Sequence, residues 1–279
     1  MLGWLRVAWR LQRWELGLSI GALCVLTVGA LVTPMTTLVG SDAWMTLLAF
    51  TLIVPIVSGL ALGVGIVGRE IGMRTGHLAW TLEPRRDRWL LGRAWPVVLM
   101  VGLPCLVLSV ATARLIEHSG PSQAYQLAMT GPNVAFRFVL ALAVGIGLGA
   151  ALRRELPGLL VGLPLMVGLV AVIGVATDPW LRANAVMVPQ GEIDGRGFVR
   201  ALTFEMAERD TAGRWVVREP QCDSPASCDA AYATMTMVMT AVPPAMHGPY
   251  AAVEALVALA GVAGFGGLAR WAISRRGPD

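Results

Sequence analysis

The densest group of side chains that could do chemistry lies in one charged segment between two apolar runs. Residues 68–93 read GREIGMRTGHLAWTLEPRRDRWLLGR and contain six arginines, three carboxylates, one histidine and two tryptophans. This segment has to lie outside lipid, because charged side chains within a bilayer are costly. Cations, carboxylates and aromatic rings together suit the binding of another molecule. We therefore expect a partner on the cytoplasmic side to be bound here.

Pro84 divides this segment into two parts. Residues 69–82 are predicted to form one helix, and residues 85–93 begin a second helix that continues into the next apolar run. The alternative interpretation is a membrane-surface helix whose arginines bind lipid phosphates. That alternative does not explain the two helices and the break, since the four residues 152–155 are enough for a turn elsewhere in the chain.

The elements around this segment are predicted to lie in a membrane. The chain is 56% hydrophobic and 14% charged, with a mean hydropathy of +0.65, whereas soluble domains carry about 25% charged residues. Long apolar runs without alternation favour helices over a barrel. We predict an all-α integral membrane protein, a single transmembrane domain over residues 1–279. Its six transmembrane helices are expected at 17–39, 44–67, 94–116, 133–151, 156–177 and 250–273.

The placement of arginine predicts the orientation of these helices. Most of the arginines fall in residues 1–16, 68–93, 152–155 and 270–279, which are therefore assigned to the cytoplasm. Both termini are then cytoplasmic, in a multi-pass protein of the plasma membrane. Residues 178–249, which hold more carboxylates than arginines, form a long external loop between spans five and six.

Residues 1–16 are predicted to form an amphipathic helix. Its leucines and Trp9 fall near one face and its arginines on the other, a pattern typical of a helix lying in the membrane interface. A cleaved signal peptide is the alternative. Glu15 and the tryptophans fit that alternative poorly, and no small-residue cleavage site follows.

Every basic residue in the chain except the histidines is arginine. A chain without lysine cannot carry a lysine-containing phosphate-binding loop or a Schiff base, so a nucleotide that drives this protein has to be bound by another chain. An intramembrane serine protease is also disfavoured, because Ser58 lacks the preceding glycine of that motif and no histidine lies at mid-span. We predict no catalytic residue, no metal site, no cofactor in this chain and no nucleic-acid partner.

The external loop holds two of the four cysteines. Cys222 and Cys228 lie in its polar part, where an oxidising compartment favours a disulfide; metal binding is the alternative. Cys24 and Cys105 lie within spans and are interpreted as packing residues. The Gly-rich beginning of the loop favours turns or short strands. Its apolar end, residues 230–242, is too short to span and predicts a re-entrant or surface helix.

Ionisable residues within or near spans need a physical reason. Glu254 lies near the outer end of the sixth predicted span, and Arg114 and Arg137 near the outer ends of the third and fourth. Snorkelling or a salt bridge at the interface explains all three. A role of Glu254 in the passage of a substrate is the alternative.

At residues 68–93 the chain resembles the cytoplasmic loop of type-2 ATP-binding-cassette (ABC) exporter permeases. These loops carry a glutamate, a glycine, two leucines, a proline, an arginine, and a glycine followed by a basic residue at the third span. The matching residues, in that order, are Glu70, Gly72, Leu78, Leu82, Pro84, Arg88, Gly92 and Arg93. A subgroup is also similar at His77, Leu78, Ala79, Trp80, Arg88, Trp89 and Leu90. The segment departs from the family at Met73, where threonine usually follows the glycine.

The resemblance extends to residues 9–13 and to the number of spans. It implies that residues 68–93 contain a coupling helix that docks on an ABC ATPase, and that residues 1–16 form a connecting helix at the membrane surface. The partner-binding residues would be Glu70, Gly72, Arg74, His77, Leu78, Trp80 and Pro84. ATP and magnesium would be bound by the partner ATPase, and this chain would pair with a second copy or a relative in the lipid bilayer.

The function that follows is the permease subunit of an ATP-driven exporter that moves a hydrophobic or amphipathic substrate outward. The alternative is a non-transporting membrane receptor or an immunity-type binding protein, with the external loop as its ligand platform. The two hypotheses differ in whether an ABC ATPase binds residues 68–93.

Overall fold

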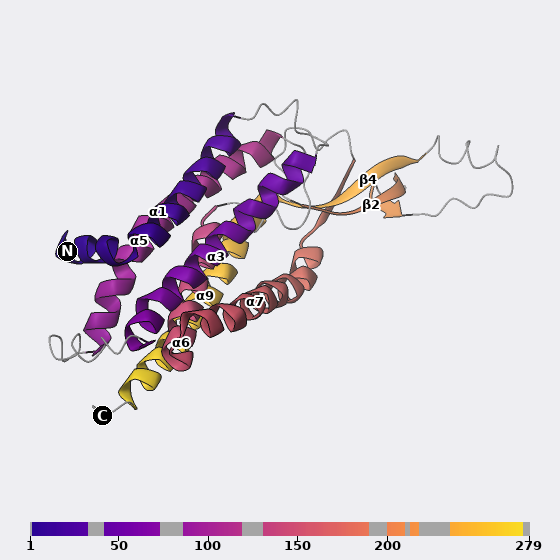
Figure 1. Cartoon of the computed structure of the whole chain (residues 1–279). Coiled ribbons are helices and arrows are strands. Elements are labelled where there is room, and N and C mark those ends of the chain that lie inside the picture. The colour runs from indigo at the N-terminus through magenta and orange to yellow at the C-terminus, as the bar shows by residue number, and fades with distance from the viewer. Residues whose placement is uncertain are drawn as a thin grey trace. The chain divides into compact units, whose positions relative to one another are not determined.

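Six long helices make up most of the structure, a computed structural model that describes residues 2–32, 42–72, 86–118, 131–189, 200–209, 213–217 and 235–275. The helices are α1 (Leu2–Val32), α3 (Asp42–Gly72), α5 (Arg86–His118), α6 (Asn133–Leu152), α7 (Glu155–Ala183) and α9 (His247–Ser274), shown in Figure 1. Each contains a stretch long and apolar enough to cross a membrane. Six membrane-capable helices were predicted, and this prediction is confirmed.

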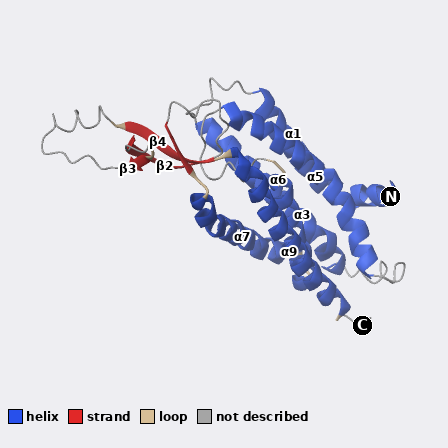
Figure 2. Cartoon of the chain, turned by 180° about the vertical axis from the view of Figure 1, so that it is seen from behind, coloured by secondary structure: helices blue, strands red, loops and turns tan. Residues whose placement is uncertain are grey.

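The chain divides into two compact units. The first comprises residues 1–115, 129–174 and 251–279, and the second comprises residues 116–128 and 175–250. The first unit is helical. Its largest buried cluster gathers side chains from α1, α3, α5, α6 and α9, among them Leu23, Leu62, Val101, Phe138 and Ile273. Figures 1 and 2 both show α1 and α5 side by side, where Ala30 packs against Ala111.

Glycine allows α3 and α6 to approach until their backbones touch. A Cβ atom at Gly59 of α3 would lie 2.6 Å from the carbonyl oxygen of Phe138, and a Cβ at Gly145 of α6 would lie 2.6 Å from that of Leu60. These distances leave no room for a side chain at either position. Close contacts of helix backbones at glycine are common between membrane helices. Helices α3 and α6 therefore form a tightly packed pair at the centre of the first unit.

Helix α1 is broken near its N-terminus. The backbone of Gln12 is not helical, with φ of −124° and ψ of 27°. The break separates a short N-terminal helix from the apolar stretch that begins at Gln12. A separate helix before the first span was predicted for residues 1–16, and the break falls within those residues.

The second unit contains a four-stranded antiparallel sheet with the order β1-β4-β2-β3. The strands, drawn in red in Figure 2, are β1 (Val186–Pro189), β2 (Arg200–Arg209), β3 (Trp215–Val217) and β4 (Thr236–Val242). A short 3-10 helix, Pro244–Met246, follows. Within this unit Leu181, Val242 and Tyr250 are buried together.

Strand β4 corrects one prediction. Residues 230–242 were expected to form a re-entrant or surface helix, but residues 236–242 are a strand that pairs with both β1 and β2. Threonine or valine occupies every second position of this strand, and β-branched residues favour the extended backbone. The all-α class therefore describes the membrane-capable helices, while residues 186–242 add a sheet. The turns or short strands expected at the Gly-rich beginning of the loop fall almost entirely on residues that lie outside the described ones.

Candidate functional site

The described structure contains both ends of the segment 68–93. Helix α3 continues through the segment's first residues to Gly72, and α5 begins at Arg86 and runs on into the third span. Glu70 and Gly72 lie in the last turn of α3. The other predicted partner-binding residues, Arg74, His77, Leu78, Trp80 and Pro84, lie outside the described residues, as do Cys222 and Cys228.

Arg69, in the last turn of α3, joins three helices at the base of this segment. Its Nη2 donates to Oε1 of Glu15 in α1 at 2.5 Å, and its Nε donates to Oε1 of Glu155 in α7 at 2.7 Å. The three side chains are about one-third exposed, at 36%, 32% and 40%. One guanidinium thus carries two charge-assisted hydrogen bonds to two different carboxylates.

A tight turn places Glu155 within reach of Arg69. Arg153, between α6 and α7, has a left-handed backbone with φ of 61°, and its N–H donates to the carbonyl of Gly149. Helix α7 then begins at Glu155, where the helix dipole favours a carboxylate. At Gly68 of α3 a Cβ atom would lie 3.6 Å from Arg154, so the end of α3 rests against this turn.

The break in α1 also contacts α3. The Nε2 of Gln12 donates to the carbonyl of Leu62 at 3.4 Å, and the Gln12 side chain lies beside Gly65. Gln12 is buried. Its amide therefore meets a backbone acceptor of α3 at the point where the N-terminal helix turns away, and Glu15 follows one turn later.

At the start of α5, an aromatic residue is buried beside a cation. Trp89 is 3% exposed, and the guanidinium carbon of Arg93 lies 5.1 Å from the centre of its ring. The two residues are four apart and share one helix face. This cation–π contact fixes the place where the segment joins the third span.

A protein-family model, described as ABC-2 membrane transporter related, matches residues 36–177 of this chain, just over half of its length. The chain belongs to the ABC-2 membrane transporter related family. A comparison with curated proteins and another with solved structures gave no match.

The family match covers most of the candidate site. Residues 36–177 of this ABC-2 protein contain α3, α5, α6, most of α7 and the whole segment 68–93. Family membership makes the chain a multi-pass permease subunit and not the ATPase, and it implies an ABC ATPase as partner. The predicted resemblance to ABC exporter permeases is confirmed at this level. Glu15 and Glu254 lie outside the matched range.

A buried ion pair joins α6 and α9 of the permease. Nε of Arg137 donates to Oε2 of Glu254 at 3.0 Å, and Nη2 donates to Oε1 at 2.5 Å. Their side chains are only 6% and 2% exposed. Snorkelling or a salt bridge was expected for Arg137 and Glu254, and the structure shows a salt bridge between them. A role in the passage of a substrate was the alternative for Glu254. In the structure its carboxylate is buried and bound by Arg137.

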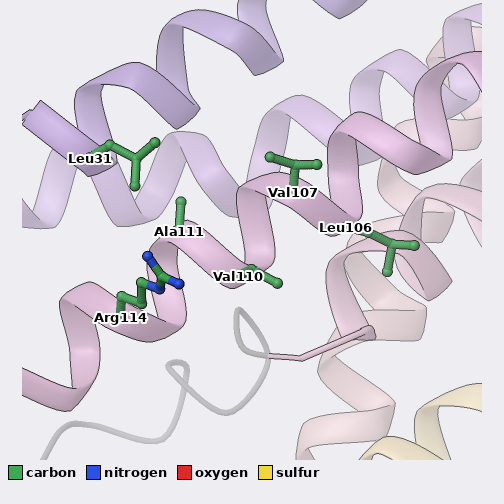
Figure 3. A pocket seen from close by; sticks show the side chains of 6 residues that line it. All are labelled: Leu31, Leu106, Val107, Val110, Ala111 and Arg114. Atoms are coloured by element: carbon green, nitrogen blue, oxygen red, sulfur yellow. The ribbon is translucent and has the colours of Figure 1, made fainter.

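Arg114 lies at one end of an apolar groove between α1 and α5. Figure 3 shows the groove, which has a volume of about 320 Å³ and is otherwise lined by Leu31, Leu106, Val107, Val110 and Ala111. Within the described ranges, no three His, Cys, Asp or Glu side chains lie close enough together to hold a metal ion.

Sequence reasoning missed the role of Arg69 and Glu155. Arg69 was recognised only as one of six arginines in the segment, and Glu155 only as part of a turn. Both residues lie at the ends of predicted spans on the same side of the membrane. This shared position is the only sign in the sequence that the two could meet. That signal does not say which charges meet, because the pairing depends on how three helices pack.

Proposed function

We propose that this ABC-2 protein is the transmembrane subunit of an ATP-driven exporter, and that a separate ABC ATPase binds and hydrolyses ATP with magnesium. The observation that carries the proposal is the family match over residues 36–177, which includes the whole segment 68–93. The six membrane-capable helices agree with a permease. The absence of lysine supports the placement of the phosphate-binding loop on another chain.

Residues 68–93 are the proposed docking site of the ATPase. The segment leaves α3 and returns in α5, so a partner that pushes on it acts on the ends of two spans at once. Glu70, Gly72, Arg74, His77, Leu78, Trp80 and Pro84 are the proposed contact residues. A docking helix gains most of its affinity from a few buried anchors, which are often aromatic, so Leu78 and Trp80 are assigned this role.

The arginine-rich segments place this docking site, and both termini, in the cytoplasm. The short helix before Gln12 then lies along the cytoplasmic surface, with arginines toward lipid phosphates and water. Its exposed Trp9 and Arg10 support this placement. Residues 178–249 face the outside, where the Cys222–Cys228 disulfide is proposed to form.

Two copies of the permease, or this chain and a relative, are proposed to assemble with two ATPase subunits. Closure of the ATPases on ATP moves the coupling segments, and the paired permeases switch access from one side to the other. Transport is outward, and the substrate is hydrophobic or amphipathic.

Co-purification tests the proposal against the alternative of a membrane receptor. The permease is expressed with a candidate ABC ATPase from the same genome and isolated in detergent, and the bound ATPase is quantified. Leu78→Ala and Trp80→Ala should each weaken binding by about tenfold or more, since a buried anchor contributes about 2 kcal/mol, and the double variant should weaken binding by about a hundredfold or more. The variant Arg85→Ala, Arg86→Ala is the matched control and should bind more of the ATPase than the Leu78, Trp80 variant.

Size-exclusion chromatography shows whether each variant is folded. If the double variant is folded and binds the ATPase fully, the segment is not the docking site and the receptor function gains support.

A further inference from the structure

The tight pair of α3 and α6 provides a rigid element that leads directly to the coupling segment. Backbone atoms of the two helices are in contact at Gly59, Gly63, Gly145 and Gly149, and several of these positions have no room for a Cβ atom. Closely packed elements transmit displacement instead of absorbing it. A push on the end of α3 is therefore expected to move α3 and α6 as one body.

Helices α1 and α7 are held to this pair less tightly. Both expose many large apolar side chains, including Leu18 and Val25 of α1 and Leu160 and Val167 of α7. Near the base of the segment α7 meets α3 through an apolar contact, Gly158 against Val64. Apolar contacts of this kind permit sliding, because they have no preferred direction.

The ion pairs of Arg69 are directional. The guanidinium is planar and its donors point in fixed directions, so Nη2 and Nε hold Glu15 and Glu155 at defined angles. Arg69 itself lies one turn before the end of α3. A displacement of the segment reaches Arg69 first and, through its two hydrogen bonds, reaches α1 and α7.

We propose that Arg69 is a positioning residue that transmits movement of the coupling segment to α1, through Glu15, and to α7, through Glu155. The inference rests on the proposed function, since it assigns the path by which the ATPase acts on the helices. It predicts that loss of Arg69 separates hydrolysis from helix movement while the ATPase remains bound. A purely structural role of Arg69 predicts loss of folding or of assembly instead.

The partial exposure of all three side chains makes the test possible. Ion pairs with this degree of exposure contribute little to folding stability, so the variant Arg69→Gln is expected to fold. Arg69→Lys keeps the charge but cannot reach two carboxylates with a fixed fork, and it should give an intermediate result. Arg154→Gln is the matched control, because Arg154 is an exposed arginine in the α6–α7 turn.

The experiment measures the distance between α1 and α7 by electron paramagnetic resonance on spin labels. Labels are placed at the exposed positions Leu18 and Leu160 in a variant without other cysteines, and the complex with the ATPase is reconstituted in lipid nanodiscs. Distances are compared without nucleotide and with ATP and vanadate. The rate of ATP hydrolysis is measured on the same samples.

The wild type and Arg154→Gln should show a change in the distance on nucleotide binding. Arg69→Gln should lose this change while it still binds the ATPase and hydrolyses ATP. Glu155→Gln is the second variant, used if Arg69→Gln does not fold, and should reduce the change. The inference is overturned if the wild-type distance does not respond to nucleotide, or if both variants respond as the wild type does. Failure of the wild type to bind an ATPase would instead refute the proposed function, and the inference with it.

Discussion

The buried pair Arg137–Glu254 allows us to predict how much each of its two charges changes the free energy of unfolding. At the 3.0 Å between Nε and Oε2, two unit charges attract by about 5–6 kcal/mol at an effective dielectric constant of about 20. The cost of removing both groups from water offsets much of this attraction. The pair as a whole is therefore expected to add little to stability, whereas either partner alone is expected to be strongly destabilising.

The test is a double-mutant cycle with methionine, an unbranched apolar side chain close in length to glutamate and shorter than arginine. Arg137→Met and Glu254→Met should each lower the free energy of unfolding by about 3–5 kcal/mol, because each leaves a buried charge without its partner. The double variant should lose less than either single variant, about 0–2 kcal/mol. Reversible unfolding in detergent by dodecyl sulfate, followed by circular dichroism, measures these differences.

An exposed pair in the same protein provides the control. Arg182 and Asp178 lie four residues apart on α7 at 2.6 Å, with side chains 59% and 30% exposed. Arg182→Met should cost only about 0.5 kcal/mol, as is usual for exposed pairs of this spacing. If Arg137→Met cost no more than Arg182→Met, or if the two buried substitutions were additive, the pair would not be the desolvated, coupled unit described above.

Three further predictions concern packing, the disulfide and the external loop. Gly63→Ala should destabilise the protein by about 1–3 kcal/mol or more, because a Cβ there overlaps the backbone of α6, whereas Gly21→Ala, with no atom within 4 Å, should not; the same unfolding assay compares them. Cys222 and Cys228 should resist labelling by a thiol reagent until the protein is reduced, and labelling of both without reduction would exclude the bond. Deletion of residues 191–229 should leave the ATPase bound in a pull-down, since the proposed docking site is on the other side of the membrane; a folded deletion variant that loses the ATPase would contradict the topology.

The membrane-capable helices could be predicted because their signal is local. Length and hydropathy identify each helix without reference to its neighbours, and four of the six predicted spans lie within the observed apolar helical stretches to within two residues. The break at Gln12 falls four residues before the predicted end of the amphipathic stretch at residue 16. Glycine-rich stretches indicated close packing, and the structure shows that α3 and α6 are the two helices involved.

The remaining features depend on contacts between distant residues. A short apolar stretch such as residues 236–242 fits a buried strand or a buried helix equally well by periodicity, and its pairing with β1 and β2 decides between them. For the same reason the sequence did not reveal the ion pairs of Arg69, whose partners are 54 and 86 residues away along the chain. Arg137 and Glu254, 117 residues apart, were recognised as needing a reason, but not as each other's partner.

The placement of the ion pairs follows from the packing of α3 and α6. Close backbone contact holds these two helices together. The charges occur instead where this pair meets helices that bury less of their surface: Arg69 of α3 meets α1 and α7, and Arg137 of α6 meets α9. The two sites lie at opposite ends of the span, since Arg137 is near the start of α6 and Glu155 follows its end; the helix rises about 22 Å from Arg137 to Leu152 at 1.5 Å per residue. A closely packed central pair with directional ties at both ends can pass a movement from one side of the membrane to the other without bending, as the proposed ATPase-driven permease requires.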